Sequence, residues 1–342
     1  MKILVINGSP KGDRSNTLQL TNAFLEGICK AQQNALPQIE TLHISQMDIK
    51  SCRGCFSCWK TTPGQCMIKD DMSFILEKLL GADITIWSFP LYYYSLPGML
   101  KMLIDRQLPL SLPFMTQNAD GGSHPARYDM GQKKTVLIST CGFYTSQANY
   151  ESVISQFDKI CGKGNYTTLF CGQGELFDIP ELSDRTQSYL ALVRQAGKEF
   201  ARNQISSQTA EKLKELLFPR EMFEQMADAS WGVTKNGEKQ DDALTFTKQM
   251  AALYDPASYK GNDIVFDMDY TDLQKQYRII LGKKESTVTE EFTGKAQTII
   301  HTPFHVWKSI AANEIEGSKT LMDHLYTVEG DFDLMLYRKD YL

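Results

Sequence analysis

Hydrophobic positions in the first two hundred residues follow two alternating patterns. Short, nearly continuous apolar runs that are rich in β-branched residues predict buried strands. These runs lie at 2–8, 38–44, 83–90, 133–142 and 166–172. Between them, residues of one face recur at three- and four-residue steps, as at Leu18, Thr21, Leu25 and Ile28, and predict amphipathic helices. The predicted helices span 16–31, 72–82, 96–106 and 184–203. Ser15 or Asn16 is suited to cap the first of them, and Asp70 or Asp71 the second.

This alternation of strands and helices predicts an α/β fold. Strands separated by helices are joined by crossovers and therefore run parallel. Five such units predict a doubly wound, five-stranded parallel sheet between two layers of helices, as in flavodoxin-like folds. Ligands of open parallel sheets bind beyond the carboxyl ends of the strands. Three loops are expected at that edge, at 8–17, 90–95 and 140–144.

The pattern changes in the second part of the chain. Residues 205–254 read as mostly helical, with a turn-prone interruption at 231–242. After Tyr259, successive β segments are followed by short helices, which predicts a smaller α+β domain. We therefore expect a first domain at 1–203, a helical connector at 204–257 and a second domain at 258–342.

Composition narrows the class of protein. The chain has 342 residues and a formal net charge of −5, from 36 Lys and Arg against 41 Asp and Glu. This balance argues against a general nucleic-acid binder. No run reaches the ~18–20 apolar residues of a membrane helix, and the start of the chain lacks a signal peptide. We expect a cytoplasmic protein, in which the eight cysteines are free thiols or metal ligands rather than disulfides.

The loop after the first strand, "NGSPKGDRSNT", has the composition of a phosphate site. It is neither a P-loop nor a dinucleotide fingerprint, because Pro10 and Asp13 stand where those motifs require other residues. Hydroxyl and amide groups of the loop can donate to phosphate oxygens, and the helix N-terminus adds free amides. Lys11 adds positive charge if Asp13 points away. The alternative is an ordinary turn with a capping serine.

Three segments together, "GSPKGDRSNT", "FPLYYYSLPGMLKMLIDR" and "STCGFY", give the chain a family resemblance over roughly 1–203. It resembles the FMN reductases and iron–sulfur flavoproteins of the flavodoxin-like superfamily. The resemblance implies FMN phosphate on Ser9, Lys11, Ser15, Asn16 and Thr17. It also implies an isoalloxazine ring between two surfaces, Pro90, Leu91, Tyr92 and Tyr93 on one side and Thr140, Cys141 and Gly142 on the other. The alternative for the tyrosines is core or interface packing.

The same resemblance implies a redox activity. NAD(P)H would reduce the flavin, and a small-molecule or ferredoxin-like acceptor would take the electrons, while the protein positions the ring. No catalytic triad or paired carboxylates are evident. Two other functions stay open: an electron carrier that does not use NAD(P)H, and an apolar-ligand binding protein whose flavin domain is a scaffold or sensor. Flavin sites of this superfamily are commonly completed by a second subunit, so we expect a homo-oligomer.

A cysteine array lies at 52–66. Cys52, Cys55, Cys58 and Cys66 have the spacing C-x2-C-x2-C-x7-C. Four cysteines suit zinc or an iron–sulfur cluster, and the compact start favours a cluster. The segment, with the "DDM" that follows it, resembles the motif of iron–sulfur flavoproteins, which implies a [4Fe–4S] cluster exchanging electrons with FMN. The alternatives are free thiols that pack a loop, or a disulfide formed in air.

The C-terminal segment, at 258–342, resembles the sterol carrier protein 2 family. The spellings "TIIHTPFHVW" and "GSKTLM…YTVEGDFDLM" carry this resemblance. It implies a sheet covered by helices around an apolar tunnel that accepts lipid-like molecules, which Trp307, Leu321, Met322 and Leu325 could line. The alternative, which we favour for each single residue, is that these side chains simply fill a core.

Overall fold

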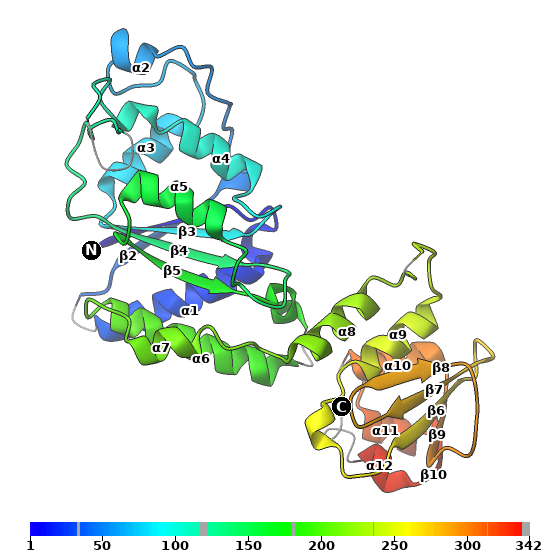
Figure 1. Cartoon of the computed structure of the whole chain (residues 1–342). Helices are drawn as coiled ribbons and strands as arrows, with labels where there is room; N and C mark the ends of the chain where they lie inside the picture. Colours follow the sequence, from blue (N-terminus) through cyan, green and yellow to red (C-terminus); the bar gives the residue numbers. More distant parts are fainter. Residues whose placement is uncertain (33–34, 117–121, 180–181, 235, 313, 337–342) are drawn as a thin grey trace. The chain divides into compact units, whose positions relative to one another are not determined.

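The chain folds into two compact units, Met1–Leu217 and Phe218–Leu342. The computed structural model describes all residues except 33–34, 117–121, 180–181, 235, 313 and 337–342 (Figure 1). The segment expected as a connector, 204–257, is divided between the units. Its first helix, α7 (Ser207–Lys212), packs on the first unit, while two further helices belong to the second.

The first unit is built on a five-stranded sheet with the order β2-β1-β3-β4-β5. All neighbouring strands are parallel, which confirms the predicted flavodoxin-like arrangement. Apolar runs of this kind arise because both faces of a parallel sheet are covered. The strands are β1 (Lys2–Asn7), β2 (Gln38–His43), β3 (Ile84–Pro90), β4 (Lys134–Thr140) and β5 (Tyr166–Cys171).

Helices cover both faces of this sheet, as Figure 1 shows. One face carries α1 (Asn16–Ala31) and α6 (Ser183–Phe200), and the other carries α3 (Met72–Gly81), α4 (Gly98–Asp105) and α5 (Glu151–Cys161). The sequence pattern predicts all of these except α5. The buried residues Val153 and Phe157, one helical turn apart, are the signal that could have found it. Short helices complete the unit: α2 (Ser57–Lys60), η1 (Gly12–Arg14), η2 (Ile44–Gln46), η3 (Leu108–Leu110) and η4 (Gly174–Asp178).

Helices α1 and α6 cross with their backbones in contact. A Cβ atom added to Gly197 would lie 2.0 Å from the carbonyl oxygen of Phe24, and one added to Gly27 would lie 2.0 Å from that of Arg194. Real Cβ atoms do not come this close to backbone. The two glycines therefore permit a crossing that every other residue type would push apart, and this crossing fixes α1, whose first turn faces the carboxyl edge of the sheet.

A carboxylate at the end of α6 holds the start of α7. Glu199 accepts from the amide of Ser206 at 2.8 Å and from the hydroxyl of Thr209 at 2.9 Å. Burial raises the pKa of Glu199, but its hydrogen bonds, from Gln195, Ser206 and Thr209, outweigh burial and lower the pKa to about 2. The pKa of Glu199 is lower in the folded state than in the unfolded state. Its stabilising effect is therefore fully present at pH values above the unfolded pKa and is lost as the pH falls toward 2.

Replacing Glu199 with glutamine should therefore lower stability in a pH-dependent way. We expect the free energy of unfolding at pH 7 to fall by about 1 kcal/mol, and the difference from wild type to shrink as the solution is acidified. Urea unfolding at neutral pH and at about pH 3 measures both differences. Equal differences at the two pH values would contradict this account.

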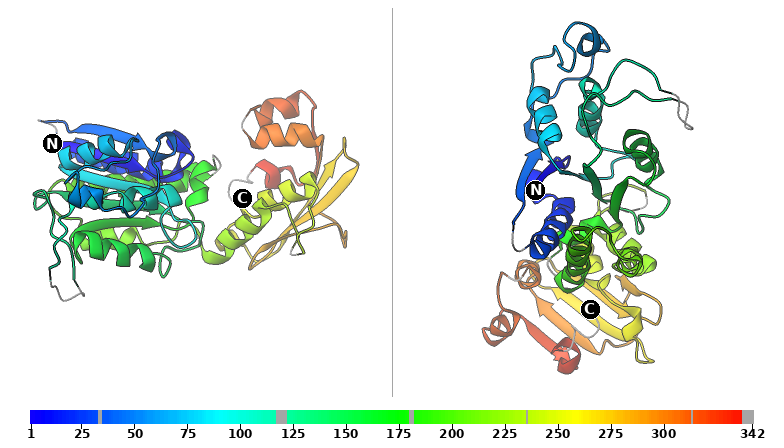
Figure 2. Two further views of the ribbon diagram at one scale, coloured as in Figure 1. Left: turned by 90° about the horizontal axis from the view of Figure 1, so that it is seen from above. Right: turned by 90° about the vertical axis from the view of Figure 1, so that its left-hand side faces the viewer.

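The second unit is a mixed sheet with helices packed on one face (Figure 2). Its strand order is β10-β9-β6-β7-β8, with β9 parallel to β6 and the other pairs antiparallel. The strands are β6 (Ile264–Tyr270), β7 (Lys275–Leu281), β8 (Ser286–Thr289), β9 (Thr298–Thr302) and β10 (Thr327–Gly330). The helices are α8 (Arg220–Ser230), α9 (Asp242–Ala251), η6 (Pro256–Ser258), α10 (Phe304–Ala311), α11 (Gly317–Met322) and α12 (Phe332–Leu336).

Alternation along β6 separates the two faces of this second sheet. Phe266, Met268 and Tyr270 are buried in a core that includes Trp307 of α10. The intervening residue Asp267 lies on the other face and forms a buried ion pair with Arg278, at 2.7 Å. One face of the sheet is therefore apolar and covered by helices, and the other is polar.

Candidate functional site

The loops that follow β1, β3, β4 and β5 meet at the carboxyl edge of the first sheet. The hydroxyls of Thr17 and Thr140 are 2.6 Å apart, and the amide of Leu91 donates to the carbonyl of Thr140 at 2.8 Å. The side-chain amide of Asn16 donates to the carbonyl of Gly174 at 2.9 Å. The structure thus brings together the three loops predicted from sequence, and adds the loop after β5, which the sequence analysis did not include.

The first turn of α1 lies at this meeting point. Ser15 is the N-cap, as predicted, and its hydroxyl accepts from the amide of Leu18 at 3.3 Å. Among the described residues, the backbone amides of Asn16 and Thr17 have no acceptor. Both residues are buried, at 8% and 1% exposure, and the Oδ1 atom of Asn16 is also without a partner in the described part of the chain. Free amides at a helix N-terminus form a binding site for an anion.

Two of the three charged residues of the loop between β1 and α1, Lys11 and Asp13, form ion pairs. Lys11 lies 3.1 Å from Asp178, and Asp13 lies 3.1 Å from the Nε2 atom of His43. The pair of Lys11 with Asp178 is half exposed, and such pairs contribute little to stability. Lys11 therefore loses little if it exchanges Asp178 for an anion. Asp13 is occupied by His43, which agrees with the expectation that it does not face the phosphate position.

An aromatic surface follows β3. The side chains of Tyr92, Tyr93 and Tyr94 are 47%, 98% and 51% exposed, and Tyr94 stacks on Phe143 at 5.4 Å between ring centroids. Leu91, by contrast, is buried in the core, so only its backbone can reach a ligand at this edge. Sequence reasoning placed Tyr93 at this surface but did not include Tyr94.

Two of these tyrosines have a left-handed backbone. Tyr93 and Tyr94 have φ values of 47° and 65°, a conformation that costs about 1–2 kcal/mol for residues other than glycine. A tight turn holds them there, because Tyr92 and Ser95 exchange two backbone hydrogen bonds of 3.0 Å. Strain of this kind is concentrated at ligand sites, where surrounding contacts maintain it.

The loop after β4 offers backbone rather than reactive side chains. Cys141 is buried, and burial raises the pKa of its thiol, so it is a poor candidate for chemistry. Gly142 is exposed, and its amide has no acceptor within the described residues. Opposite the tyrosines, the structure therefore places a free amide donor.

The four cysteines of the array line one small pocket of about 20 Å³ beside α4. Cys58, in α2, is buried, Cys66 is half-buried, and Cys52 and Cys55 are exposed. Burial is the main cause that raises the pKa of the Cys58 thiol, and the neighbouring Cys66 adds to it. A hydrogen bond with Ser57 lowers the pKa of Cys55.

The geometry of this pocket is not that of a preformed single-ion site. In the described residues, no three His, Cys, Asp or Glu side chains are arranged to hold one metal ion. Sulfur atoms bound to one ion lie about 4 Å apart, because each metal–sulfur bond is about 2.3 Å long. A four-iron cluster places each sulfur on a different iron atom and needs a wider arrangement. What the structure does show is that all four thiols of the array line one pocket.

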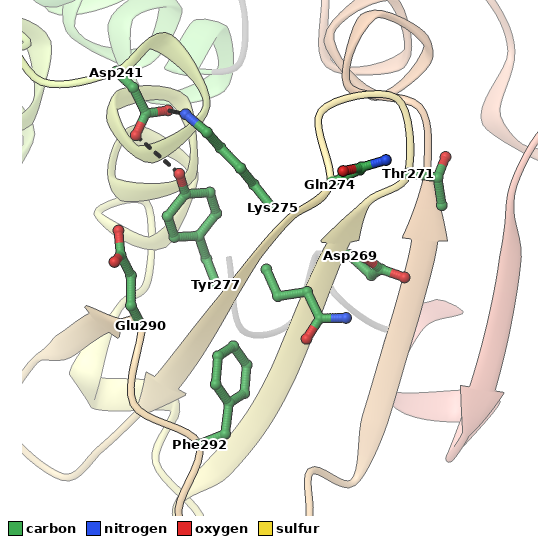
Figure 3. Close-up of a pocket in the computed structure, with 9 residues that line it drawn as sticks. Asp241, Asp269, Thr271, Gln274, Lys275, Tyr277, Glu290 and Phe292 are labelled. Atoms are coloured by element: carbon green, nitrogen blue, oxygen red, sulfur yellow. Dashed lines mark hydrogen bonds and ion pairs between the residues drawn. The ribbon is translucent and has the colours of Figure 1, made fainter.

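The second unit has a pocket of about 760 Å³ beside the turn between β6 and β7 and the start of α9 (Figure 3). Asp241 accepts from the hydroxyl of Tyr277 at 2.9 Å and pairs with Lys275 at 3.2 Å. The residues suggested for an apolar tunnel lie elsewhere: Trp307 is buried in the core and Leu321 packs against it, whereas Met322 and Leu325 are 74% and 50% exposed. This pocket is therefore not the expected apolar tunnel.

No helix within the described residues is long and apolar enough to cross a membrane.

Comparisons with known proteins agree with the fold of the first unit. Residues 1–175 match the family described as having a flavodoxin-like fold. This range includes the loop between β1 and α1 and the cysteine array. An iron–sulfur flavoprotein of Archaeoglobus fulgidus is 40% identical over 106 residues, which are 31% of this chain and 48% of that protein. An iron–sulfur flavoprotein of Methanocaldococcus jannaschii is 35% identical over 142 residues, 40% of this chain and 68% of that protein.

The chain thus spans about half the length of the first of these relatives and about two thirds of the second. Among solved structures, an azoreductase from Bacillus anthracis has a TM-score of 0.43 and 16% identity, covering 59% of this chain and 98% of that one. A similarity this low supports no conclusion about function. The family match and the relatives rest instead on sequence, and together they show that the chain belongs to the flavodoxin-like fold family and is related to the iron–sulfur flavoproteins within it.

Proposed function

We propose that the protein is an FMN-dependent oxidoreductase that takes electrons from NAD(P)H and passes them through bound flavin to a small-molecule or protein acceptor. The observation that carries this proposal is the buried first turn of α1 beside an exposed aromatic surface. There the amides of Asn16 and Thr17 find no acceptor in the part of the chain that the structure describes. An anion joined to a flat ring matches both features. FMN is such a molecule.

In this proposal, one set of protein groups binds the phosphate of FMN and another set positions its ring. The amides of Asn16 and Thr17, with the hydroxyl of Ser9, would bind the phosphate, and Lys11 would add charge. Tyr92 to Tyr94 and the amide of Gly142 would position the ring and exclude water from one side. When bound, the flavin supplies the hydride chemistry, and the protein supplies orientation and electrostatics.

We further propose that Cys52, Cys55, Cys58 and Cys66 hold a [4Fe–4S] cluster that exchanges electrons with the flavin. The shared pocket and the all-thiol donor set support this, as do the names of the relatives in Archaeoglobus and Methanocaldococcus. The thiolates would act only as ligands. A bound cluster would supply one-electron chemistry, and bound flavin would supply two-electron chemistry.

Protein purified without oxygen would test both parts. We expect flavin absorption bands over a broad cluster absorption, with iron and acid-labile sulfide on the same sample. Added NADH or NADPH should bleach the flavin bands. Failure to bind flavin, even with added FMN, would contradict the proposed activity, while flavin without iron would remove only the cluster.

An electron carrier that does not use NAD(P)H is the second candidate, favoured by relatives whose names specify iron–sulfur flavoproteins. The same sample separates the two functions. If reduced ferredoxin bleaches the flavin and neither pyridine nucleotide does, the carrier is the correct function. For the second unit, the resemblance to sterol carrier protein 2 stays a proposal, tested by whether apolar ligands co-purify.

The aromatic surface supports a homo-oligomer. Tyr93 is 98% exposed and Phe143 is 40% exposed, and such residues are normally covered by a ligand or partner. We propose that a second copy of this chain covers part of them and completes the flavin site. Light scattering that gives a monomer mass would overturn this.

Replacing Asn16 with aspartate should weaken FMN binding by at least about tenfold. The new carboxylate would stand beside the phosphate position and repel it, and interactions with charged groups are worth about 1.5–3 kcal/mol. The change would also remove the amide group that donates to the carbonyl of Gly174. Flavin fluorescence titration measures the dissociation constant. Asn165→Asp is a matched control, because Asn165 also donates to a carbonyl, that of Cys161 at 3.1 Å, but precedes β5 at the opposite edge of the sheet. Equal affinity in both variants would show that the phosphate lies elsewhere.

A further inference from the structure

The ends of the cysteine segment, residues 51–69, are tied together. The amide of Lys50 donates to the carboxylate of Asp70 at 3.0 Å, and the Lys50 ammonium donates to the carbonyl of Lys69 at 2.9 Å. One step further out, Asp48 and Asp71 are joined by a backbone hydrogen bond of 3.0 Å. The cysteine segment is therefore a closed loop. Its two ends, at 48–50 and 69–71, are held together by hydrogen bonds and are called the neck below.

Arg106, at the end of α4, binds both sides of this neck. Its Nη1 and Nη2 atoms donate to the two carboxylate oxygens of Asp70, at 2.6 and 2.9 Å, and Nη1 also donates to the carbonyl of Lys50 at 2.5 Å. The side chains of Arg106 and Asp70 are 1% and 0% exposed. Burial alone would raise the pKa of Asp70, but the hydrogen bonds from Arg106 and from the Lys50 amide keep it below its usual value.

The Nε atom of Arg106 takes no part in these bonds. This atom is buried and has no acceptor among the described residues, although a guanidinium normally uses its donors when it is buried. Arg106 lines the same pocket as the four cysteines. Burial lowers the pKa of Arg106, whereas Asp70 and the neighbouring Cys66 raise it. A buried, positively charged side chain with an unused Nε donor therefore lines the same pocket as Cys66.

We propose that Arg106 is a positioning and charge-balancing residue of the cysteine site, which fixes the neck of the loop through Asp70 and Lys50 and donates from Nε to the cluster-bound sulfur of Cys66. This inference rests on the proposed cluster. It also assigns Cys66, which follows the longest interval of the array, as the fourth ligand. A fixed cation beside an anionic cluster stabilises the more negative, reduced state, so Arg106 raises the reduction potential.

Two variants separate charge from geometry. Arg106→Gln combined with Asp70→Asn removes both charges together, which avoids leaving one buried charge unpaired. Arg106→Lys keeps the charge but loses the fork and the Nε donor. The matched control is Arg278→Gln with Asp267→Asn, which removes a buried Arg–Asp fork with two 2.7 Å bonds in the second unit. Each protein is measured for iron and sulfide after reconstitution, for its midpoint potential followed by electron paramagnetic resonance, and for thermal unfolding without iron.

We expect the double variant at Arg106 and Asp70 to lose its cluster or to keep it at a more negative potential. The lysine variant should shift in the same direction by less, and the control should keep the wild-type iron content and potential. If the double variant does not fold, the iron content and the midpoint potential of the Arg106→Lys variant test the inference. Wild-type iron and wild-type potential in the folded variants would overturn the inference while leaving the proposed function intact. A wild-type protein that takes up no iron would instead show that the proposed cluster itself is wrong, and the inference falls with it.

Discussion

Serine in place of Cys58 should abolish the absorption of the proposed cluster and remove most of the iron bound to it. Cys58 is the one buried member of the four cysteines, on the short helix α2, and it faces the same pocket as the other three. A serine oxygen is a poor replacement, because clusters are held by thiolates. The side chains are nearly equal in size, so the fold should survive and the loss should be one of ligation.

The flavin supplies an internal control for this variant. Flavin content should stay at the wild-type level, because no proposed flavin contact lies in the cysteine segment. Cys161→Ser is the matched variant, since Cys161 is half-buried at the end of α5 and does not line the pocket. It should keep wild-type iron. Unchanged iron in the Cys58 variant, measured by colorimetric assay on anaerobic protein, would show that the cysteine array does not hold the cluster.

Alanine in place of Gly197 should strongly destabilise the first unit, although it adds only one methyl group. The new Cβ would lie 2.0 Å from the carbonyl oxygen of Phe24 and 2.8 Å from its carbon, and backbone atoms cannot rotate away as a side chain can. Helices α1 and α6 must then separate. Overpacking typically costs 1–3 kcal/mol, and we expect a loss of about 3 kcal/mol or more because the clash is with backbone.

A thermal melt of the first unit's transition would measure this loss. For a unit of this size, 1 kcal/mol shifts the midpoint by about 2–4 °C, so the expected fall is about 6–12 °C. Gly81→Ala is the matched control, because a Cβ at Gly81 meets nothing within 4 Å, and alanine favours the helix. That variant should be neutral or slightly more stable. Equal midpoints for the two variants would contradict the close crossing of α1 and α6.

Local patterning was sufficient to predict most of the first fold. The apolar run of β1 and the three- and four-residue steps of α1 place these elements, and Ser15 caps the helix where the sequence suggested. The reason is physical, because strands buried on both faces and helices buried on one face need distinct apolar periodicities. The parallel order followed from the alternation of elements. In the second unit, β segments and short helices follow Tyr259, as predicted.

Other features depended on residues that are distant in sequence. Arg106 finds Asp70 across 36 positions, and neither residue shows this partnership in its own local pattern. Asp70, suggested as a helix cap, does accept from the amide of Met72, but its carboxylate mainly serves Arg106 and Lys50. The sequence analysis likewise did not place Tyr94 against Phe143, because that stacking joins loops from two different strands.

The sequence by itself determined the α/β architecture, the edge of the sheet where a ligand would bind, and the four thiols of one short segment. Only the tertiary structure decided which groups at that edge lack partners, as the amides of Asn16 and Thr17 do within the described residues. It also decided that Leu91 is buried while Tyr93 is exposed, and that Arg106 closes the cysteine loop. Periodicity records which face of an element is buried, whereas hydrogen-bond partners and exposure are set by segments that meet only when the chain is folded.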